Sequence, residues 1–273
     1  MNLKQALKQA SIYLEKYDFP EHLLEAEVLL MQVLGITKEQ LFKTPEAKLS
    51  CWQILKLRYF LFKRKNNWPI AYLTGHKEFY GLDFVVNKNV LIPRPLSEEI
   101  IEQALNIIKA NQKRPLTIVD VGTGSGCLII ALAKTLLKTE PLENFKFLAS
   151  DISAAALKVA KQNTKLHGLE KNITFLQGSL LEPFNNTKID LIITNLPYLT
   201  PKHLQERSIK KEPRLALVGD LYPELIRQVG NRHACSLPDG SPQIIKEDLD
   251  GVAPAVIPDL IGDPNKSTII TIQ

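Results

Sequence analysis

The first 75 residues combine apolar and charged positions with the spacing of amphipathic helices. Segments 1–15, 21–34 and 51–65 each carry one apolar face. Between the last two, Thr37-Lys-Glu-Gln40 has the spacing of a capping box, which predicts another short helix. The basic run 63–65 is interpreted as a solvated helix end, where cations suit the helix dipole. This part of the chain is therefore predicted to be all-helical.

The pattern changes near residue 70. The run that begins Tyr80-Gly81-Leu-Asp-Phe is short, rich in strand formers and bounded by turn residues, which predicts a β-hairpin. Leu91-Ile-Pro-Arg-Pro95 follows, and its two prolines exclude a helix there. Ser97-Glu-Glu then predicts a capped helix that runs to about residue 109.

After Pro115, strand-like and helical segments alternate. This alternation predicts an α/β fold with a doubly wound, mostly parallel, Rossmann-like sheet. Ligands bind at the carboxyl ends of the strands in such sheets, so the residues after each strand are the candidates for chemistry. The predicted strands are 116–119, 145–150, 173–176 and 189–194, and the predicted helices between them include 127–137 and 154–167.

The last part of the chain has a different texture. Residues 213–264 hold seven of the seventeen prolines, with glycines scattered among them. So many helix and strand breakers are expected to exclude long regular elements. Residues 267–273 could supply one last strand.

Composition narrows the class of protein without identifying a function. The chain has 273 residues, of which 45% are hydrophobic and 23% charged, so one large or two modest globular domains are expected. A net charge of +5 is too small to diagnose nucleic-acid binding. Cys51, Cys127 and Cys235 have no metal-ligand spacing, so we expect no metal site and a reduced, cytoplasmic setting. No segment has the ~18 apolar residues that a membrane span needs, and no membrane association is expected.

Two features suggest a nucleoside site. A glycine loop, Asp120-Val-Gly122-Thr123-Gly124-Ser125-Gly126, directly follows the first predicted strand and would let a ligand approach the backbone. Such a loop alone is a weak signal, because dinucleotide and methyl-donor enzymes share it. Asp151 follows the second strand, where a carboxylate can accept hydrogen bonds from both ribose hydroxyls. Alternatively, Asp151 caps the next helix, a role that Ser153 could fill equally well.

A third feature favours a methyl donor over a dinucleotide. Asn195-Leu196-Pro197-Tyr198 follows the fourth predicted strand. An amide nitrogen is a poor nucleophile because its lone pair is delocalised, so it must be held in line with the methyl group that it attacks. The Asn195 side-chain oxygen and the Leu196 carbonyl can each accept one N–H. Pro197 would stiffen the loop, and Tyr198 would stack on the planar group.

These segments together resemble the protein-(glutamine-N5) methyltransferases, the family that modifies the Gly-Gly-Gln loop of peptide chain release factors. The resemblance covers roughly residues 20–225. It rests on the three motifs above and on Trp68-Pro-Ile-Ala-Tyr-Leu-Thr-Gly75, Glu78-Phe-Tyr-Gly81, Leu91-Ile-Pro-Arg-Pro95 and Glu212-Pro-Arg-Leu-Ala-Leu217.

The resemblance implies S-adenosyl-L-methionine as the cofactor and a release factor as the protein partner. It also places Arg94 next to the active site, although an ordinary salt bridge is an equal alternative. Nucleic acid is not expected to be required, and a monomer is expected. The implied substrate-holding residues are Asn195, Leu196, Pro197 and Tyr198. The implied donor-binding residues are Gly122, Thr123, Gly124, Ser125, Gly126, Asp151, Ser179, Leu180 and Asn195.

The chain departs from the family pattern at three places. The family usually reads Asn-Pro-Pro-Tyr, and Leu196 in the second position is expected to make the loop less rigid. Ser179 and Leu180 replace the acidic and aromatic residues expected near the adenine, which predicts weaker donor binding. After about residue 225 little matches, and the closing antiparallel hairpin is expected to be missing, with an exposed sheet edge.

Two other functions compete with glutamine methylation. Asn-Leu-Pro-Tyr is the usual form in ribosomal RNA adenine dimethyltransferases, so a nucleic-acid amino-methyltransferase is the first alternative. The atypical tail suggests the second, a weakened, non-catalytic homologue. Cys127 is interpreted as a packing residue rather than a reactive one.

The predicted organisation has three parts. Residues 1–75 form a small helical domain that recognises the substrate, and residues 76–96 form a β-hairpin linker. Residues 97–273 form the S-adenosylmethionine-dependent, class I methyltransferase domain.

Overall fold

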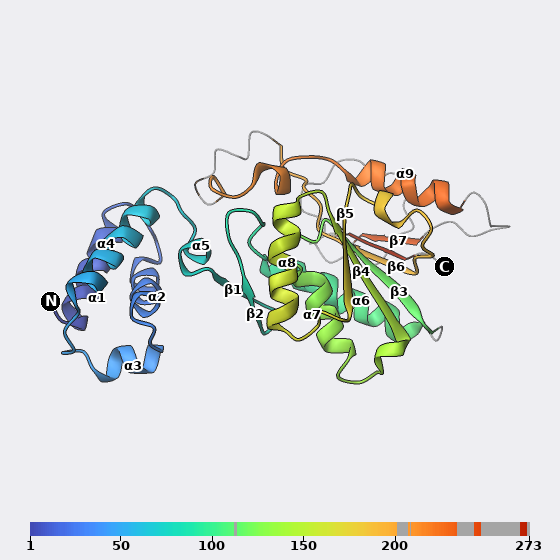
Figure 1. Cartoon of the computed structure of the whole chain (residues 1–273). Coiled ribbons are helices and arrows are strands. Elements are labelled where there is room, and N and C mark those ends of the chain that lie inside the picture. Colours follow the sequence, from blue (N-terminus) through green and yellow to red (C-terminus); the bar gives the residue numbers. More distant parts are fainter. Residues whose placement is uncertain (112–113, 201–206, 208, 234–242, 247–267, 272–273) are drawn as a thin grey trace. The chain divides into compact units, whose positions relative to one another are not determined.

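Two compact units make up the chain in the computed structural model (Figure 1). The first comprises Met1–His76 with Gln205–Lys211, and the second comprises Lys77–Leu204 with Glu212–Gln273. The structure describes all residues except 112–113, 201–206, 208, 234–242, 247–267 and 272–273.

Helices build the first unit, as predicted. Its hydrophobic core includes Leu14, Leu29 and Leu57 from three different helices. The capping box predicted at Thr37 and Gln40 is confirmed, and equivalent boxes open the first and fourth helices. No helix in the described part of the chain is long and apolar enough to cross a membrane. The helices are α1 (Leu3–Glu15), α2 (His22–Leu34), α3 (Lys38–Lys43), α4 (Cys51–Lys65) and α5 (Ile70–Thr74).

The basic run at the end of α4 is not the solvated helix end that the sequence suggested. The Arg64 guanidinium donates two hydrogen bonds of 2.6 Å to the carboxylate of Glu25 on α2. Both side chains are largely buried, at 16% and 11% exposure. Lys63 lies over the ring of Trp68, with its Nζ 4.3 Å from the centroid. The run therefore packs α4 against its surroundings, because a planar guanidinium can bridge to a buried carboxylate on a neighbouring helix.

The predicted β-hairpin is confirmed at the start of the second unit. Strands β1 (His76–Phe79) and β2 (Leu82–Val85) form a two-stranded sheet. The two turn residues, Tyr80 and Gly81, have φ values of 52° and 70°. Two consecutive left-handed residues are what a two-residue hairpin with right-handed strand twist requires.

The second unit is built on a six-stranded sheet with the order β5-β4-β3-β6-β8-β7. Strands β3 to β6 are parallel, which confirms the doubly wound, mostly parallel sheet. The strands are β3 (Leu116–Val121), β4 (Phe145–Asp151), β5 (Ile173–Gln177), β6 (Leu191–Thr194), β7 (Gln243–Lys246) and β8 (Thr268–Thr271). The helices are α6 (Glu98–Ala110), α7 (Cys127–Leu136), α8 (Ala154–Leu166) and α9 (Tyr222–His233), with short 3-10 turns at 95–97, 142–144, 182–184 and 214–216.

Alternate residues of each strand point to opposite faces of this sheet, and helices cover both faces. Ile118 of β3 packs in a cluster with residues of α6 and α7, while its neighbour Val119 packs with Leu225 and Val229 of α9. Figure 1 shows α9 across the sheet from α6 and α7. Because both faces are covered, the parallel strands are nearly continuous apolar runs, which is why the sequence predicted them well.

Two expectations about the tail are wrong. The proline-rich region was expected to lack long regular elements, yet α9 spans 12 residues. Its single proline, Pro223, is the second residue of the helix, where a missing N–H breaks no helical hydrogen bond. The edge of β6 was expected to be exposed, yet β8 pairs antiparallel with β6, and β7 pairs antiparallel with β8. The predicted last strand is confirmed as β8.

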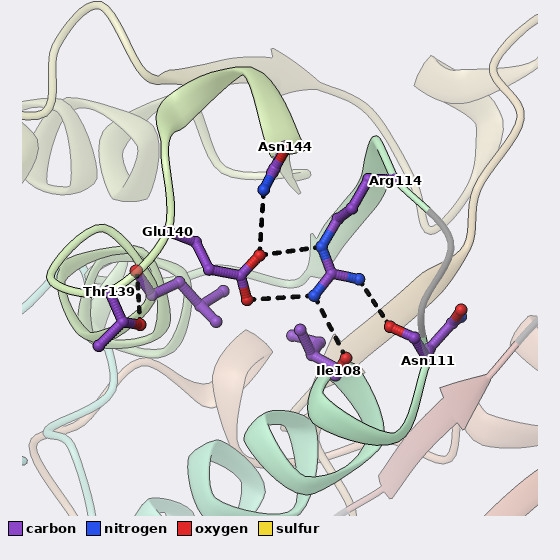
Figure 2. A network of polar contacts seen from close by, with 7 residues as sticks. Ile108, Asn111, Arg114, Thr139, Glu140 and Asn144 are labelled. Atoms are coloured by element: carbon purple, nitrogen blue, oxygen red, sulfur yellow. Dashed lines mark hydrogen bonds and ion pairs between the residues drawn. The ribbon is translucent and has the colours of Figure 1, made fainter.

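An arginine at the amino end of β3 ties three segments together (Figure 2). Arg114 donates to both carboxylate oxygens of Glu140, at 3.0 and 3.1 Å, and to the carbonyl of Asn111 at 2.7 Å. Asn144 donates to the same carboxylate at 3.2 Å. These contacts connect the end of α6, the start of β3 and the turn before β4 at the end of the sheet opposite the strands' carboxyl ends.

Candidate active site

A cavity of about 280 Å³ lies at the carboxyl ends of β3, β4, β5 and β6, within the second unit. Loops that follow these strands form part of its wall, and residues from segments 89–97 and 213–221 form the rest. Gly126 and Tyr198 are predicted site residues that do not line it. The predicted residues that do are Gly122, Thr123, Gly124, Ser125, Asp151, Ser179, Leu180, Asn195, Leu196 and Pro197.

The glycine loop adopts a backbone that other residues would strain. Gly122, Gly124 and Gly126 have φ values of 73°, 55° and 81°. Gly124 faces open space, since a Cβ there would meet nothing nearer than the Gly122 carbonyl at 4.0 Å. Gly126 serves packing instead, because a Cβ would lie 3.0 Å from Ile130 Cδ1. The bare backbone at Gly124 thus leaves room for a ligand.

Asp151 is held by backbone N–H groups of the glycine loop and of the residue that caps the next helix. Its Oδ2 accepts a hydrogen bond from the Gly124 N–H at 2.9 Å, and its Oδ1 accepts one from the Ser153 N–H at 2.8 Å. The alternative role as helix cap belongs to Ser153, whose hydroxyl accepts from the Ala156 N–H at 3.2 Å. Burial raises the pKa of Asp151. Each carboxylate oxygen has a second lone pair, so Asp151 can still accept from a ligand hydroxyl.

Ser179 and Leu180 line the cavity after β5. Leu180 has a φ of 47°, uncommon for a leucine, and its carbonyl accepts a hydrogen bond from the buried Ser150 hydroxyl at 3.1 Å. Gly178 must be glycine here, because a Cβ would lie 2.4 Å from Pro183 Cγ. The loop is therefore held in one conformation by its neighbours.

Asn195 is oriented by a residue that the sequence did not single out for this purpose. Its Nδ2 donates a 3.0 Å hydrogen bond to the hydroxyl of Ser97, which also lines the cavity. Ser97 was expected to cap α6, but its side chain makes no capping hydrogen bond. Because the amide nitrogen is engaged, the Asn195 Oδ1 is the atom left to accept a proton donor in the cavity. No local signal could have paired residues 98 positions apart.

Leu196 is more firmly held than its sequence suggested. Its side chain is 3% exposed and packs in the cluster that contains Leu225. Its N–H donates to the Tyr222 hydroxyl at 3.2 Å. The N–H contact is one that a proline at this position could not make.

A buried carboxylate joins two of the segments that carry the family resemblance. Glu212, whose side chain is fully buried, accepts a hydrogen bond from the Ile92 N–H at 3.1 Å and pairs with the Arg94 guanidinium. Arg94 does not line the cavity, so the salt-bridge interpretation describes its contact. The pair fixes the segments that carry Pro93 and Pro213 to the cavity wall.

Cys127 lines the cavity, but its thiol has low reactivity. Burial raises the pKa of its thiol to about 12. The reactive thiolate is therefore scarce at neutral pH, which agrees with a packing role.

The donor chemistry fits the residues present. Gly124 offers a bare backbone, and Asp151 offers lone pairs for a ribose diol. Asn195 and Leu196 lie in the same cavity and can present two acceptor oxygens to a planar nitrogen.

Comparisons with known proteins match both parts of the chain to known families. The family described as "Methyltransferase domain" matches residues 112–228, and "PrmC N-terminal domain" matches residues 5–75. Among solved structures, an RNA methyltransferase from Salinibacter ruber is 20% identical with a TM-score of 0.35, covering 67% of this chain and 92% of that one. A similarity of that size adds nothing to the assignment.

The curated relatives decide the family. A release factor glutamine methyltransferase from Moorella thermoacetica is 37% identical over 221 residues, which cover 80% of this chain and 75% of the relative. One from Koribacter versatilis is 37% identical over 238 residues, which cover 84% and 81%. The chain therefore belongs to the release factor glutamine methyltransferase family.

Proposed function

We propose that this protein transfers a methyl group from S-adenosyl-L-methionine to the side-chain amide nitrogen of a glutamine, in the Gly-Gly-Gln loop of peptide chain release factors. The observation that carries the proposal is that the expected substrate-holding residues and the expected donor-binding residues line the same cavity. Asn195 and Leu196 lie there beside the glycine loop and Asp151.

The donor would be held by residues from three loops. Asp151 would accept hydrogen bonds from the ribose hydroxyls, and the backbone around Gly124 would lie against the donor. Ser179 would hydrogen-bond the adenine amine, and Leu180 would pack against the base. The bound donor supplies an activated methyl group on a sulfonium centre.

The acceptor nitrogen would be held by two oxygens. The Asn195 Oδ1 and the Leu196 carbonyl would each accept one N–H of the glutamine amide, which localises its lone pair and aligns it for attack. Ser97 keeps the Asn195 amide from flipping by accepting from its nitrogen. The rate enhancement would come mainly from proximity and orientation. No base is needed beforehand, because the nitrogen can lose its proton after the transfer.

The helical unit offers a surface for a large protein substrate. Trp52, Leu55, Tyr59 and Phe62 of α4 are 72%, 58%, 53% and 57% exposed, and their spacing of three and four puts them on one face. Exposed apolar patches of this kind mark interaction sites. We propose that this α4 stripe binds the release factor, and that residues 1–75 form the substrate-recognition domain.

The decisive experiment is transfer of radiolabelled methyl, with purified release factor and ribosomal subunits offered in parallel. We expect label on the release factor and none after its Gly-Gly-Gln glutamine is replaced. Label on ribosomal RNA instead would favour the nucleic-acid alternative. Asn195→Ala should abolish transfer and leave much of the donor binding, and retained turnover in that variant would contradict the mechanism.

We also propose that the protein acts in the cytoplasm as a monomer and needs no nucleic acid. Light scattering on a size-exclusion column should give one chain of 30.7 kDa. Ribonuclease treatment should leave the transfer rate unchanged.

A further inference from the structure

Leu196 has one backbone angle that its neighbours in sequence do not restrict. Pro197 follows it and biases its ψ toward extended values. In the Asn-Pro-Pro-Tyr form usual in the family, a proline ring at this position would also fix φ. With leucine, φ is free unless tertiary contacts hold it. The direction of the Leu196 carbonyl depends on both angles.

Two contacts hold Leu196, one through its backbone N–H and one through its side chain. The Tyr222 hydroxyl accepts a hydrogen bond of 3.2 Å from the Leu196 N–H. The leucine side chain is buried, and its Cδ2 packs against Gly122, 3.1 Å from the position that a Cβ there would take. Tyr222 is the first residue of α9, and its ring packs against the cluster that contains Leu225 and Val229. A helix on one face of the sheet thus anchors the loop at the cavity.

We propose that Tyr222 is a positioning residue that replaces the missing proline ring. Its hydroxyl holds the Leu196 N–H, so that the Leu196 carbonyl keeps the direction in which it accepts a substrate N–H. The proposal rests on the proposed function for the role of that carbonyl. The proposed role of Tyr222 is specific to this chain's loop, because a proline at 196 would have no N–H to donate to the Tyr222 hydroxyl.

The first test is a double-mutant cycle of Tyr222→Phe and Leu196→Pro, measured as methyl transfer to a release factor. Tyr222→Phe keeps the ring and removes only the hydroxyl. In the leucine background it should lower kcat roughly two- to tenfold, the range that one neutral hydrogen bond supplies, with KM for the donor unchanged. In the Leu196→Pro background the same change should have no effect on kcat.

Tyr80→Phe in the β1–β2 turn is the matched control, since it removes a tyrosine hydroxyl that does not line the cavity and should leave kcat unchanged. An equal loss in both backgrounds would mean that the hydroxyl acts elsewhere and would overturn the proposal. No loss of kcat in the leucine background would overturn it as well.

The second test does not depend on activity. Hydrogen exchange of a peptide that ends at Leu196 should be faster in Tyr222→Phe than in the unmodified protein, at an unchanged melting temperature. Unchanged exchange would overturn the proposed contact. If the unmodified protein methylated no release factor, the proposed function would fail, and the exchange comparison would still decide whether Tyr222 holds the loop.

Discussion

Asp120 carries a carboxyl group that is completely enclosed beneath the glycine loop. Its Oδ2 accepts a 2.6 Å hydrogen bond from the Thr123 hydroxyl, and its buried Oδ1 has no hydrogen-bond partner among the described residues. Burial raises its pKa from the usual 3.8 to about 7, and the nearby Asp151 contributes to the rise. Because the folded pKa is raised, ionisation of Asp120 costs stability progressively as pH rises from about 4 to about 7.

Asp120→Asn should therefore stabilise the free protein at pH 8 by about 1–3 kcal/mol, because it removes a buried charge. At pH 5 the gain should be much smaller, because the wild-type carboxyl is then mostly protonated in the folded state. Urea unfolding at the two pH values measures this. A gain that is the same at both would contradict the raised pKa.

The second prediction for a single residue concerns Gly178. In Gly178→Ala the new methyl group would overlap Pro183, so the Ser179–Leu180 loop must shift. We expect a loss of about 1–3 kcal/mol in stability together with weaker donor binding, measured by calorimetry. Gly219→Ala is the control, because its Cβ would meet Pro197 only at an ordinary 3.4 Å. Equal effects of the two changes would argue against the clash.

At the scale of elements, most contacts that hold the cavity's walls join segments far apart in sequence. Glu212 holds Ile92 and Arg94, Ser97 holds Asn195, and Tyr222 holds Leu196. At the opposite end of the sheet, the Arg114–Glu140 pair joins α6 to the turn before β4 (Figure 2). Local propensity determines each helix and strand, and these hydrogen bonds and ion pairs determine how the elements are positioned against one another.

Glu140→Gln tests the connection between Arg114 and Glu140. The hydrogen bonds from Arg114 lower the pKa of Glu140. A lowered folded pKa means that the pair stabilises the fold above the unfolded pKa of 4.5 and loses this contribution as pH falls through the folded pKa. We expect Glu140→Gln to cost about 1 kcal/mol at pH 7, and the difference from wild type to shrink below pH 4.5.

The neighbouring exposed Glu143 provides the control for that change. Glu143→Gln lies in the same turn and should change the melting temperature by less than a degree or so at either pH. A similar loss in both variants would show that the charge of the turn matters rather than the pair with Arg114.

At the scale of the whole molecule, the chain has two units with separate hydrophobic cores, and we propose that one captures the release factor while the other carries out the chemistry. The α4 stripe belongs to one, and the cavity belongs to the other. If the proposed division holds, changes in the stripe should affect the capture of the release factor and leave the donor site intact.

Trp52→Ala combined with Phe62→Ala should raise KM for the release factor roughly tenfold, since two large apolar contacts are lost. The KM for S-adenosyl-L-methionine should stay the same. Ile12→Ala removes an equally exposed apolar side chain from α1 and should leave both constants unchanged. A loss of kcat at saturating release factor in the stripe variant would contradict a role limited to capture.

Local sequence determined most elements of this protein and indicated the candidates for its chemistry. The spacing of apolar residues, together with capping and turn residues, predicted the helices of the first unit, the hairpin at Tyr80-Gly81 and the four parallel strands. The positions at the strand ends identified Asp151 and Asn195 as candidates, because the carboxyl ends of parallel strands converge at one edge. The structure confirms these elements, because each depends on residues a few positions apart, and it brings Asp151 and Asn195 to one cavity.

Tertiary structure alone decided the rest. Pairs such as Ser97 with Asn195, Glu212 with Arg94 and Tyr222 with Leu196 are separated by 26 to 118 residues. Propensity and pattern carry no information about such partners, so a serine that looked like a helix cap became the acceptor for Asn195. For the same reason the sequence predicted the last strand, β8, but not that it would pair with the edge of β6.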